Sequence, residues 1–314
     1  MSARKPRIGL ALGSGSARGW AHIGIIDALA EAGIEPDIVC GTSIGSLVGA
    51  AYVAGRLGDL RQWAEAVTWR EIVGLMDIRL SGGGLIDGKD VVAFLDKLGI
   101  TGIIEALPKP FAAVATDLFT GREIWLQSGS VLDAVRASIA IPGIFTPAWL
   151  DGKWLLDGGL ANPVPVSVTR ALGADIIIAV NLNSDLVGRH TVEASKATEA
   201  DAGSTGAFLG RLLEQVPAAA RVQAAQIASW LSPEPASGPP APGYFDVLAT
   251  SINIMQDHIT RTRLAGEPPH VMLVPRLRDI GLMDYDRAAE AIAEGRACVA
   301  QAMPALERYL GEAV

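Results

Sequence analysis

Short apolar runs alternate with segments of helical periodicity along the first 183 residues. Helical spacing of apolar side chains marks residues 20–32, and small residues fill 46–54. Four apolar runs are short and uninterrupted, as is typical of strands buried on both faces: residues 8–12, 38–40, 111–116 and 175–181. Strands that alternate with helices predict an α/β fold, a mostly parallel central sheet flanked by helices.

The pattern changes after residue 183. Polar and small residues come first, then a helical pattern, and five prolines between residues 232 and 243 predict a linker. Helical spacing resumes at Tyr244, followed by a strand pattern and a last helix. We therefore predict three parts: a core over residues 6–183, an insertion over 184–243, and C-terminal helices and a strand over 244–314 that complete the core, with the strand at 271–275 and the last helix at 288–310.

Composition and charge narrow the classes of protein. Half of the 314 residues are hydrophobic and 19% are charged, which is typical of a folded globular chain. The net charge of −8 argues against a general nucleic-acid binder. Two cysteines cannot form a disulfide framework, and no apolar run reaches the roughly 18 residues of a membrane span. We expect a cytoplasmic location with peripheral membrane contact.

The stretch "CGTSIGS" places Ser43 in a Gly-x-Ser-x-Gly pattern. A strand pattern precedes it and a helical pattern follows, which is the context of a nucleophile elbow. The surrounding turn would consist of Gly41, Thr42, Ile44 and Gly45, with the glycines where backbones pass closely. A glycine-rich helix cap with an idle Ser explains the pentapeptide equally well.

The glycine-rich stretch "GSGSARG" lies between the first strand and the first helix. Its backbone N–H groups could stabilise an oxyanion, and Arg18 could brace the loop or meet a phosphate. A dinucleotide fingerprint requires Gly-x-Gly-x-x-Gly, and Gly19 comes one residue late for it. A purely structural turn remains the alternative. The candidate oxyanion residues are Gly13, Ser14, Gly15 and Ser16.

Asp157 precedes Gly158 and Gly159 in a turn after a strand-like segment. Its carboxylate could accept a proton from Ser43 as a general base, or could merely form an Asx-turn with nearby backbone. Histidine is the usual base for a serine, and a Ser–Asp–His order exists with either of the late histidines. No histidine stands in a recognisable motif, and no His/Cys cluster has the spacing of a metal site; the four histidines are His22, His190, His258 and His270.

Four blocks in this order resemble the patatin-like phospholipases, and more narrowly their bacterial branch related to neuropathy target esterase: "LGSGSARGWAHIG", "GTSIGS", "RASIAIPGIFTP" and "DGGLANPVPV". The resemblance covers roughly residues 7 to 185. It implies a three-layer sandwich and a dyad of Ser43 and Asp157 without a catalytic histidine. It also implies an oxyanion loop at residues 13–16 with Arg18, Gly19, Gly158 and Gly159 in support. In the family this loop is often a run of glycines, and here Ser14 and Ser16 interrupt it.

The resemblance further implies a lipid acyl ester as substrate and no cofactor. A non-catalytic protein that binds a lipid or a protein partner is the alternative function, and a second copy of the chain is a further candidate partner. We expect an acyl pocket lined by Pro142, Ile144, Phe145 and Pro147. Tryptophan favours the lipid headgroup zone, so the candidates for a membrane-facing surface are Trp63, Trp69, Trp149, Trp154 and Trp230.

Overall fold

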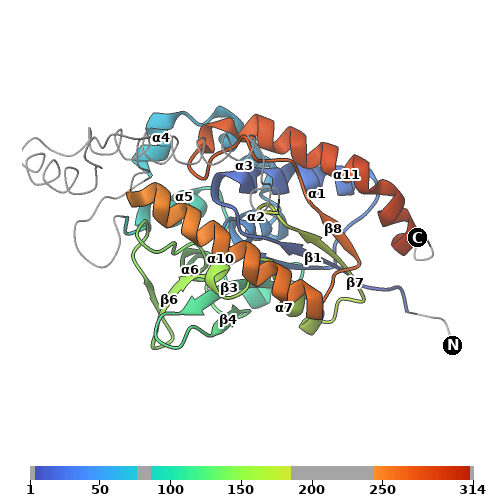
Figure 1. The fold of residues 1–314 in the computed structure, drawn as a ribbon, viewed down its shortest axis with the longest axis horizontal. Coiled ribbons are helices and arrows are strands. Elements are labelled where there is room, and N and C mark those ends of the chain that lie inside the picture. Colours follow the sequence, from blue (N-terminus) through green and yellow to red (C-terminus); the bar gives the residue numbers. More distant parts are fainter. Residues whose placement is uncertain (1–3, 76–85, 185–243, 312–314) are drawn as a thin grey trace, which may run out of the picture.

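A computed structural model of the chain describes residues 4–75, 86–184 and 244–311. Within them, one eight-stranded sheet lies between two layers of helices (Figure 1). This arrangement confirms the predicted α/β sandwich. Apart from residue 184, the predicted insertion at 184–243 lies outside the described residues, and so do His190 and Trp230.

The predicted strands and helices recur with small shifts in their bounds. The strands are β1 (Ile8–Leu12), β2 (Ile38–Thr42), β3 (Phe111–Asp117), β4 (Glu123–Leu126), β5 (Ala148–Leu150), β6 (Lys153–Asp157), β7 (Ile176–Val180) and β8 (Val271–Leu273). The α-helices are α1 (Ala21–Glu31), α2 (Ile44–Val53), α3 (Leu57–Ala66), α4 (Trp69–Gly74), α5 (Lys89–Lys97), α6 (Val131–Ser138), α7 (Val166–Ala171), α10 (Tyr244–Gly266) and α11 (Ala288–Leu310). Short 3₁₀ helices are η1 (Ser16–Trp20), η2 (Ile104–Ala106), η3 (Gly158–Leu160) and η4 (Tyr285–Arg287).

The sheet is parallel at its centre and antiparallel at one side. Its strand order is β5-β6-β3-β2-β1-β7-β8, with β4 paired to β3 off this path. Strands β1, β2, β3, β7 and β8 pair in parallel, and β4, β5 and β6 are added by antiparallel pairing. Strand β8 and helix α11 come from the C-terminal part, and α11 packs against α1.

Alternation along β1 directs side chains to two different cores. Leu10 and Leu12 join the larger apolar cluster, which is covered by α1, α2 and α11. Ala11 joins a smaller cluster with Val164 and Val166, on the side of α7. Burial on both faces explains why the central strands read as continuous apolar runs.

Strand β3 brings two distant segments end to end. Strand β4 pairs with residues 113–116 of β3 along one edge. Since a strand has only two edges, β2 and β6 share the other: β2 pairs with residues 111–114 and β6 with 115–117. The carboxyl end of β2 therefore meets the carboxyl end of β6, which places Ser43 beside Asp157.

Candidate active site

Ser43 occupies a strained turn between β2 and α2. Its backbone has φ 56° and ψ −127°, a left-handed φ that a non-glycine residue rarely adopts. The flanking glycines are required by close backbone approach, because a Cβ at Gly41 would overlap the carbonyl of Gly45, and one at Gly45 would overlap the carbonyl of Leu12. The Gly-x-Ser-x-Gly pattern is thus a consequence of the tight crossing of β1, β2 and α2.

The Ser43 hydroxyl donates a hydrogen bond to Oδ2 of Asp157 at 2.6 Å. The other carboxylate oxygen, Oδ1, accepts the N–H of Gly159 at 2.7 Å. One carboxylate oxygen therefore forms the Asx-turn, and the other accepts the hydrogen bond of the serine. Thr116 also donates to the Asp157 carbonyl at 2.8 Å, which fixes the end of β6 against β3.

Burial changes the acidity of this carboxyl. Asp157 is 2% exposed and Ser43 is 4% exposed. Burial raises the pKa of Asp157 from 3.8 to about 6, although the hydrogen bonds from Ser43 and Gly159 act in the lowering direction. A carboxylate with a raised pKa is a stronger base than an ordinary aspartate, and it is still mostly ionised at neutral pH.

The backbone N–H groups of the loop after β1, at residues 13–16, are of two kinds: two donate to backbone carbonyls of the described residues and two do not. Those of Gly13 and Ser14 donate to the carbonyls of Val180 and Pro163. The N–H groups of Gly15 and Ser16 have no acceptor among the described residues. Two of the four predicted loop residues therefore have N–H groups that are available to a ligand.

Two buried basic side chains, Arg18 and His22, form hydrogen bonds to backbone carbonyls at and beside this loop. Arg18 is fully buried and donates from Nε to the carbonyl of Ile280 at 2.7 Å, a contact expected of a bracing side chain. Nε2 of His22 donates to the carbonyl of Gly13 at 2.8 Å. Burial lowers the pKa of His22 to about 4, so the ring is neutral at pH 7.

The histidines that the structure describes do not form a triad with Ser43. His22 donates to the Gly13 carbonyl. His270 accepts the N–H of Ile177 on β7, which is separated from β2 by β1 in the sheet. His258 is exposed on α10. Within the described residues, the side chain that bonds the Ser43 hydroxyl is Asp157.

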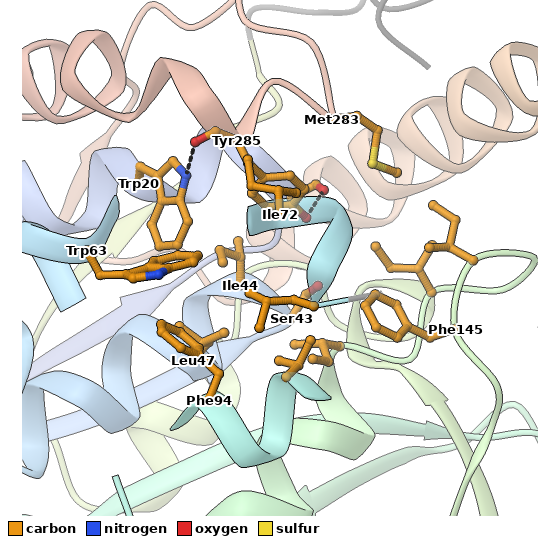
Figure 2. Close-up of a pocket in the computed structure, with 16 residues that line it drawn as sticks. Trp20, Ser43, Ile44, Leu47, Trp63, Ile72, Phe94, Phe145, Met283 and Tyr285 are labelled. Carbon is orange, nitrogen blue, oxygen red and sulfur yellow. Dashed lines mark hydrogen bonds between the residues drawn. The ribbon is translucent and has the colours of Figure 1, made fainter. Parts of the chain in front are cut away.

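An apolar cavity opens at Ser43 (Figure 2). Its volume is about 100 Å³, and apart from Ser16, Ser43 and Tyr285 the side chains that line it are apolar. Figure 2 shows Ser43 between Phe145 on one side and Leu47 and Trp63 on the other. Of the four residues expected to line an acyl pocket, Ile144 and Phe145 do so; Pro142 and Pro147 are not part of the lining, since the cavity runs toward α3 and α5.

Two residues at the site were not among the site residues predicted from the sequence. Ser138, in the third block, accepts the N–H of Ser43 at 2.9 Å and donates to the carbonyl of Val114 at 2.6 Å. Tyr285 lies 240 residues beyond the elbow in sequence, yet its hydroxyl is 2.7 Å from that of Ser16 and its carbonyl accepts Nε1 of Trp20 (Figure 2). Only the tertiary structure brings these two side chains to the elbow and the loop.

Three of the five membrane-facing tryptophan candidates have side chains that the structure describes, whereas those of Trp69 and Trp230 lie outside the described part. Trp63 lines the cavity, whereas Trp149 and Trp154 are 59% and 40% exposed, with ring centroids 5.0 Å apart. No helix within residues 4–75, 86–184 and 244–311 is both long and apolar enough to cross a membrane. Across the same ranges, no three His, Cys, Asp or Glu side chains are grouped so as to hold a metal ion.

Comparison with known proteins gives a consistent result. The family model for patatin-like phospholipase matches residues 10–170. Uncharacterized NTE family proteins of Mycobacterium tuberculosis and Mycobacterium bovis are 38% identical, over 96% of this chain and 92% of theirs. Human patatin-like phospholipase domain-containing protein 6 is 34% identical over 184 residues, 56% of this chain and 13% of that protein. The crystal structure of VipD from Legionella pneumophila aligns with a TM-score of 0.37 and 14% identity, over 99% of this chain and 80% of that one.

The family model covers the loop after β1, the elbow and the turn that holds Asp157. The mycobacterial relatives extend the similarity over nearly the whole length, including the C-terminal part that contributes β8 and α11. The chain therefore belongs to the patatin-like phospholipase family, among its NTE relatives.

Proposed function

We propose that this protein is a serine hydrolase that cleaves carboxylic esters of phospholipids or lysophospholipids through a dyad of Ser43 and Asp157. The observation that carries the proposal is the 2.6 Å hydrogen bond between these two buried side chains, of which Ser43 lines an apolar cavity. The family and its NTE relatives support lipid ester hydrolysis at a coarser level.

In the first half-reaction, Oγ of Ser43 attacks the ester carbonyl carbon while its proton passes to Oδ2 of Asp157. The N–H groups of Gly15 and Ser16 donate to the resulting oxyanion, because neither has another acceptor among the described residues. The tetrahedral intermediate collapses, the carbon–oxygen bond to the alcohol breaks, and Asp157 protonates the departing alkoxide.

In the second half-reaction, Asp157 takes a proton from water, and the water oxygen attacks the acyl carbon on Ser43. The bond to Oγ then breaks, and the proton returns from Asp157 to the serine. The acyl chain leaves as a fatty acid. Each step needs one base with a pKa near the working pH, and the buried Asp157 carboxyl fulfils this condition.

Exposed aromatic residues on β5 and on the turn after β3 support peripheral contact with a lipid surface. Phe119 is 81% exposed on the turn after β3, and Trp149 is 59% exposed on β5. Leu118 donates its N–H to the carbonyl of Trp154, so this turn and the β5–β6 hairpin are adjacent. Loss of sedimentation with phosphatidylcholine vesicles in Phe119→Ala would support the contact, and unchanged binding would contradict it. The cytoplasmic location and self-association stay predictions.

The decisive experiment measures fatty-acid release from a lysophosphatidylcholine by the wild type, Ser43→Ala and Asp157→Asn, with Asp133→Asn as a control at an exposed helix position. We expect release by the wild type and the control, and loss of at least a thousandfold in both dyad variants, on the order seen when a catalytic triad member is removed. Release that survives in Ser43→Ala would reject the mechanism. No release from any acyl ester would favour a non-catalytic lipid-binding role.

A further inference from the structure

Two cavities meet at Trp63. The first is the apolar cavity at Ser43. The second is an open pocket on the outer surface between α3 and α5, lined by Arg56, Asp59 and Lys97 among others. Trp63 is the residue common to both linings, and its side chain is half-buried, as expected for a ring with one cavity on each side.

Aromatic packing holds this shared wall in place. The ring centroid of Trp63, on α3, is 4.2 Å from that of Phe94, on α5. It is also 6.0 Å from Trp20 in an edge-to-face arrangement. Figure 2 shows these rings together at the side of the cavity away from Phe145. Such contacts keep a ring in one position, so the wall is a fixed end rather than a loose side chain.

The two sides of the wall differ in polarity. Apart from Ser16, Ser43 and Tyr285, the inner lining consists of aliphatic, aromatic and methionine side chains. The outer pocket carries charged groups, and Arg56 forms an ion pair with Asp59 there at 3.5 Å. A hydrocarbon chain gains free energy for each methylene that it buries on the inner side. It gains nothing once the wall stops it.

We propose that Trp63 sets the maximum length of the acyl chain by closing the cavity on the side of Ser43 that lies away from Phe145. This inference rests on the proposed function, because it assigns the acyl part of the substrate to that cavity. Trp63 is then a specificity-determining residue, which contacts the end of the chain and takes no part in bond breaking.

Variants at two positions should move the length limit in opposite directions. Trp63→Ala joins the inner cavity to the outer pocket and allows longer chains. Trp63→Leu opens less space and keeps part of the packing against Phe94, so it tests the same direction if the alanine variant is unstable. Leu47→Phe fills space between Ser43 and the wall and should shorten the accepted chain. Trp125→Ala, at an exposed tryptophan outside both cavities, is the matched control.

Binding can be measured independently of hydrolysis. In a Ser43→Ala background, linear 1-alkanols of about 6 to 16 carbons are titrated so that they displace a bound fluorescent apolar probe. Affinity should rise roughly fourfold per methylene and then level off where the chain meets Trp63. With Trp63→Ala the rise should continue for at least two more methylenes, so that the longest alcohols bind at least about sixteenfold tighter than before. Leu47→Phe should level off earlier.

The inference would be overturned if affinity stopped rising at the same chain length in the Ser43→Ala parent and in both Trp63 variants. It would also be overturned if Trp125→Ala moved this chain length as much as Trp63→Ala does. Hydrolysis of p-nitrophenyl esters of matching lengths is measured in parallel with Ser43 intact. A Trp63-dependent length limit in binding without any ester hydrolysis would reject the proposed function, and would show that Trp63 limits the length of a bound apolar chain. Ester hydrolysis with the same chain-length preference in the wild type and the Trp63 variants would support the proposed function and reject the role of Trp63.

Discussion

The raised pKa of Asp157 makes activity sensitive to pH in a range where an ordinary aspartate would not be. As pH falls through about 6, the buried carboxyl takes up a proton and can no longer accept one from Ser43. At pH 5, a group with a pKa of about 6 is ionised in roughly one molecule in ten. We therefore expect kcat/KM to be about tenfold lower at pH 5 than its plateau above pH 7.

The assay is the pH profile of kcat/KM on a soluble short-chain ester, between pH 4.5 and 8. An aspartate with the ordinary pKa of 3.8 would stay almost fully ionised at pH 5, so the two cases differ by about a factor of ten. Burial lowers the pKa of His22 to about 4, so that ring does not titrate in the upper part of this range. A flat profile from pH 7 to pH 5 would refute the reasoning.

Stability gives a second reading of the same shift. Because the folded pKa is raised above the unfolded value, the stabilising contribution is fully present below pH 3.8 and is lost as pH rises through about 6. The rise in the pKa of Asp157 from 3.8 to about 6 lowers the free energy of unfolding by about 3 kcal/mol at pH 7. Asp157→Asn removes this penalty, so we expect it to unfold at higher urea concentration than the wild type at pH 7, with the difference vanishing near pH 4. Equal stability at pH 7 would show that the buried charge is not costly.

Three further substitutions test the surroundings of the dyad. Tyr285→Phe removes the hydroxyl that contacts Ser16, so kcat should fall about tenfold with little change in KM; a change in KM alone would contradict a role in holding the loop. Gly45→Ala forces a Cβ onto the carbonyl of Leu12 and should lower the free energy of unfolding by about 1–3 kcal/mol in urea titrations, whereas wild-type stability would refute the close approach. Ser138→Ala leaves the buried N–H at the elbow without its acceptor, so stability should fall by about 1–3 kcal/mol and kcat should fall with it; unchanged values would mean that another group replaces the acceptor.

Much of the fold could be predicted from local patterns. The runs at residues 8–12 and 111–116 are strands because a segment buried on both faces has no polar side to display, and β1 and β3 confirm this. The predicted helix at 46–54 begins two residues earlier, at Ile44. Strand β2 extends to Thr42 and one residue makes the turn, which leaves no linker before the helix. Boundaries of this kind depend on the turn geometry rather than on periodicity.

The sequence by itself determined which residue types are present for chemistry: a serine between glycines, an aspartate before two glycines, and a glycine-rich loop after a buried strand. Each signal is local, because turn geometry and close backbone approach restrict the residues in a few consecutive positions. For this reason the elbow, the loop and the aspartate turn could be named without coordinates, and the ordered set could be matched to a family.

The residues alone left the partner of Ser43 open between Asp157 and a histidine, and the family resemblance implied Asp157; only the tertiary structure gives the physical reason for the contact. Strands β2 and β6 share one edge of β3, and that register places Asp157, rather than a histidine, against Ser43. Burial then raises the pKa of the carboxyl, an effect of the whole surrounding protein that no local pattern encodes. The position of Trp63 between two cavities has the same origin, since it depends on the packing of α3 against α5. Contacts between residues far apart in sequence are set by packing, and packing is a property of the folded chain.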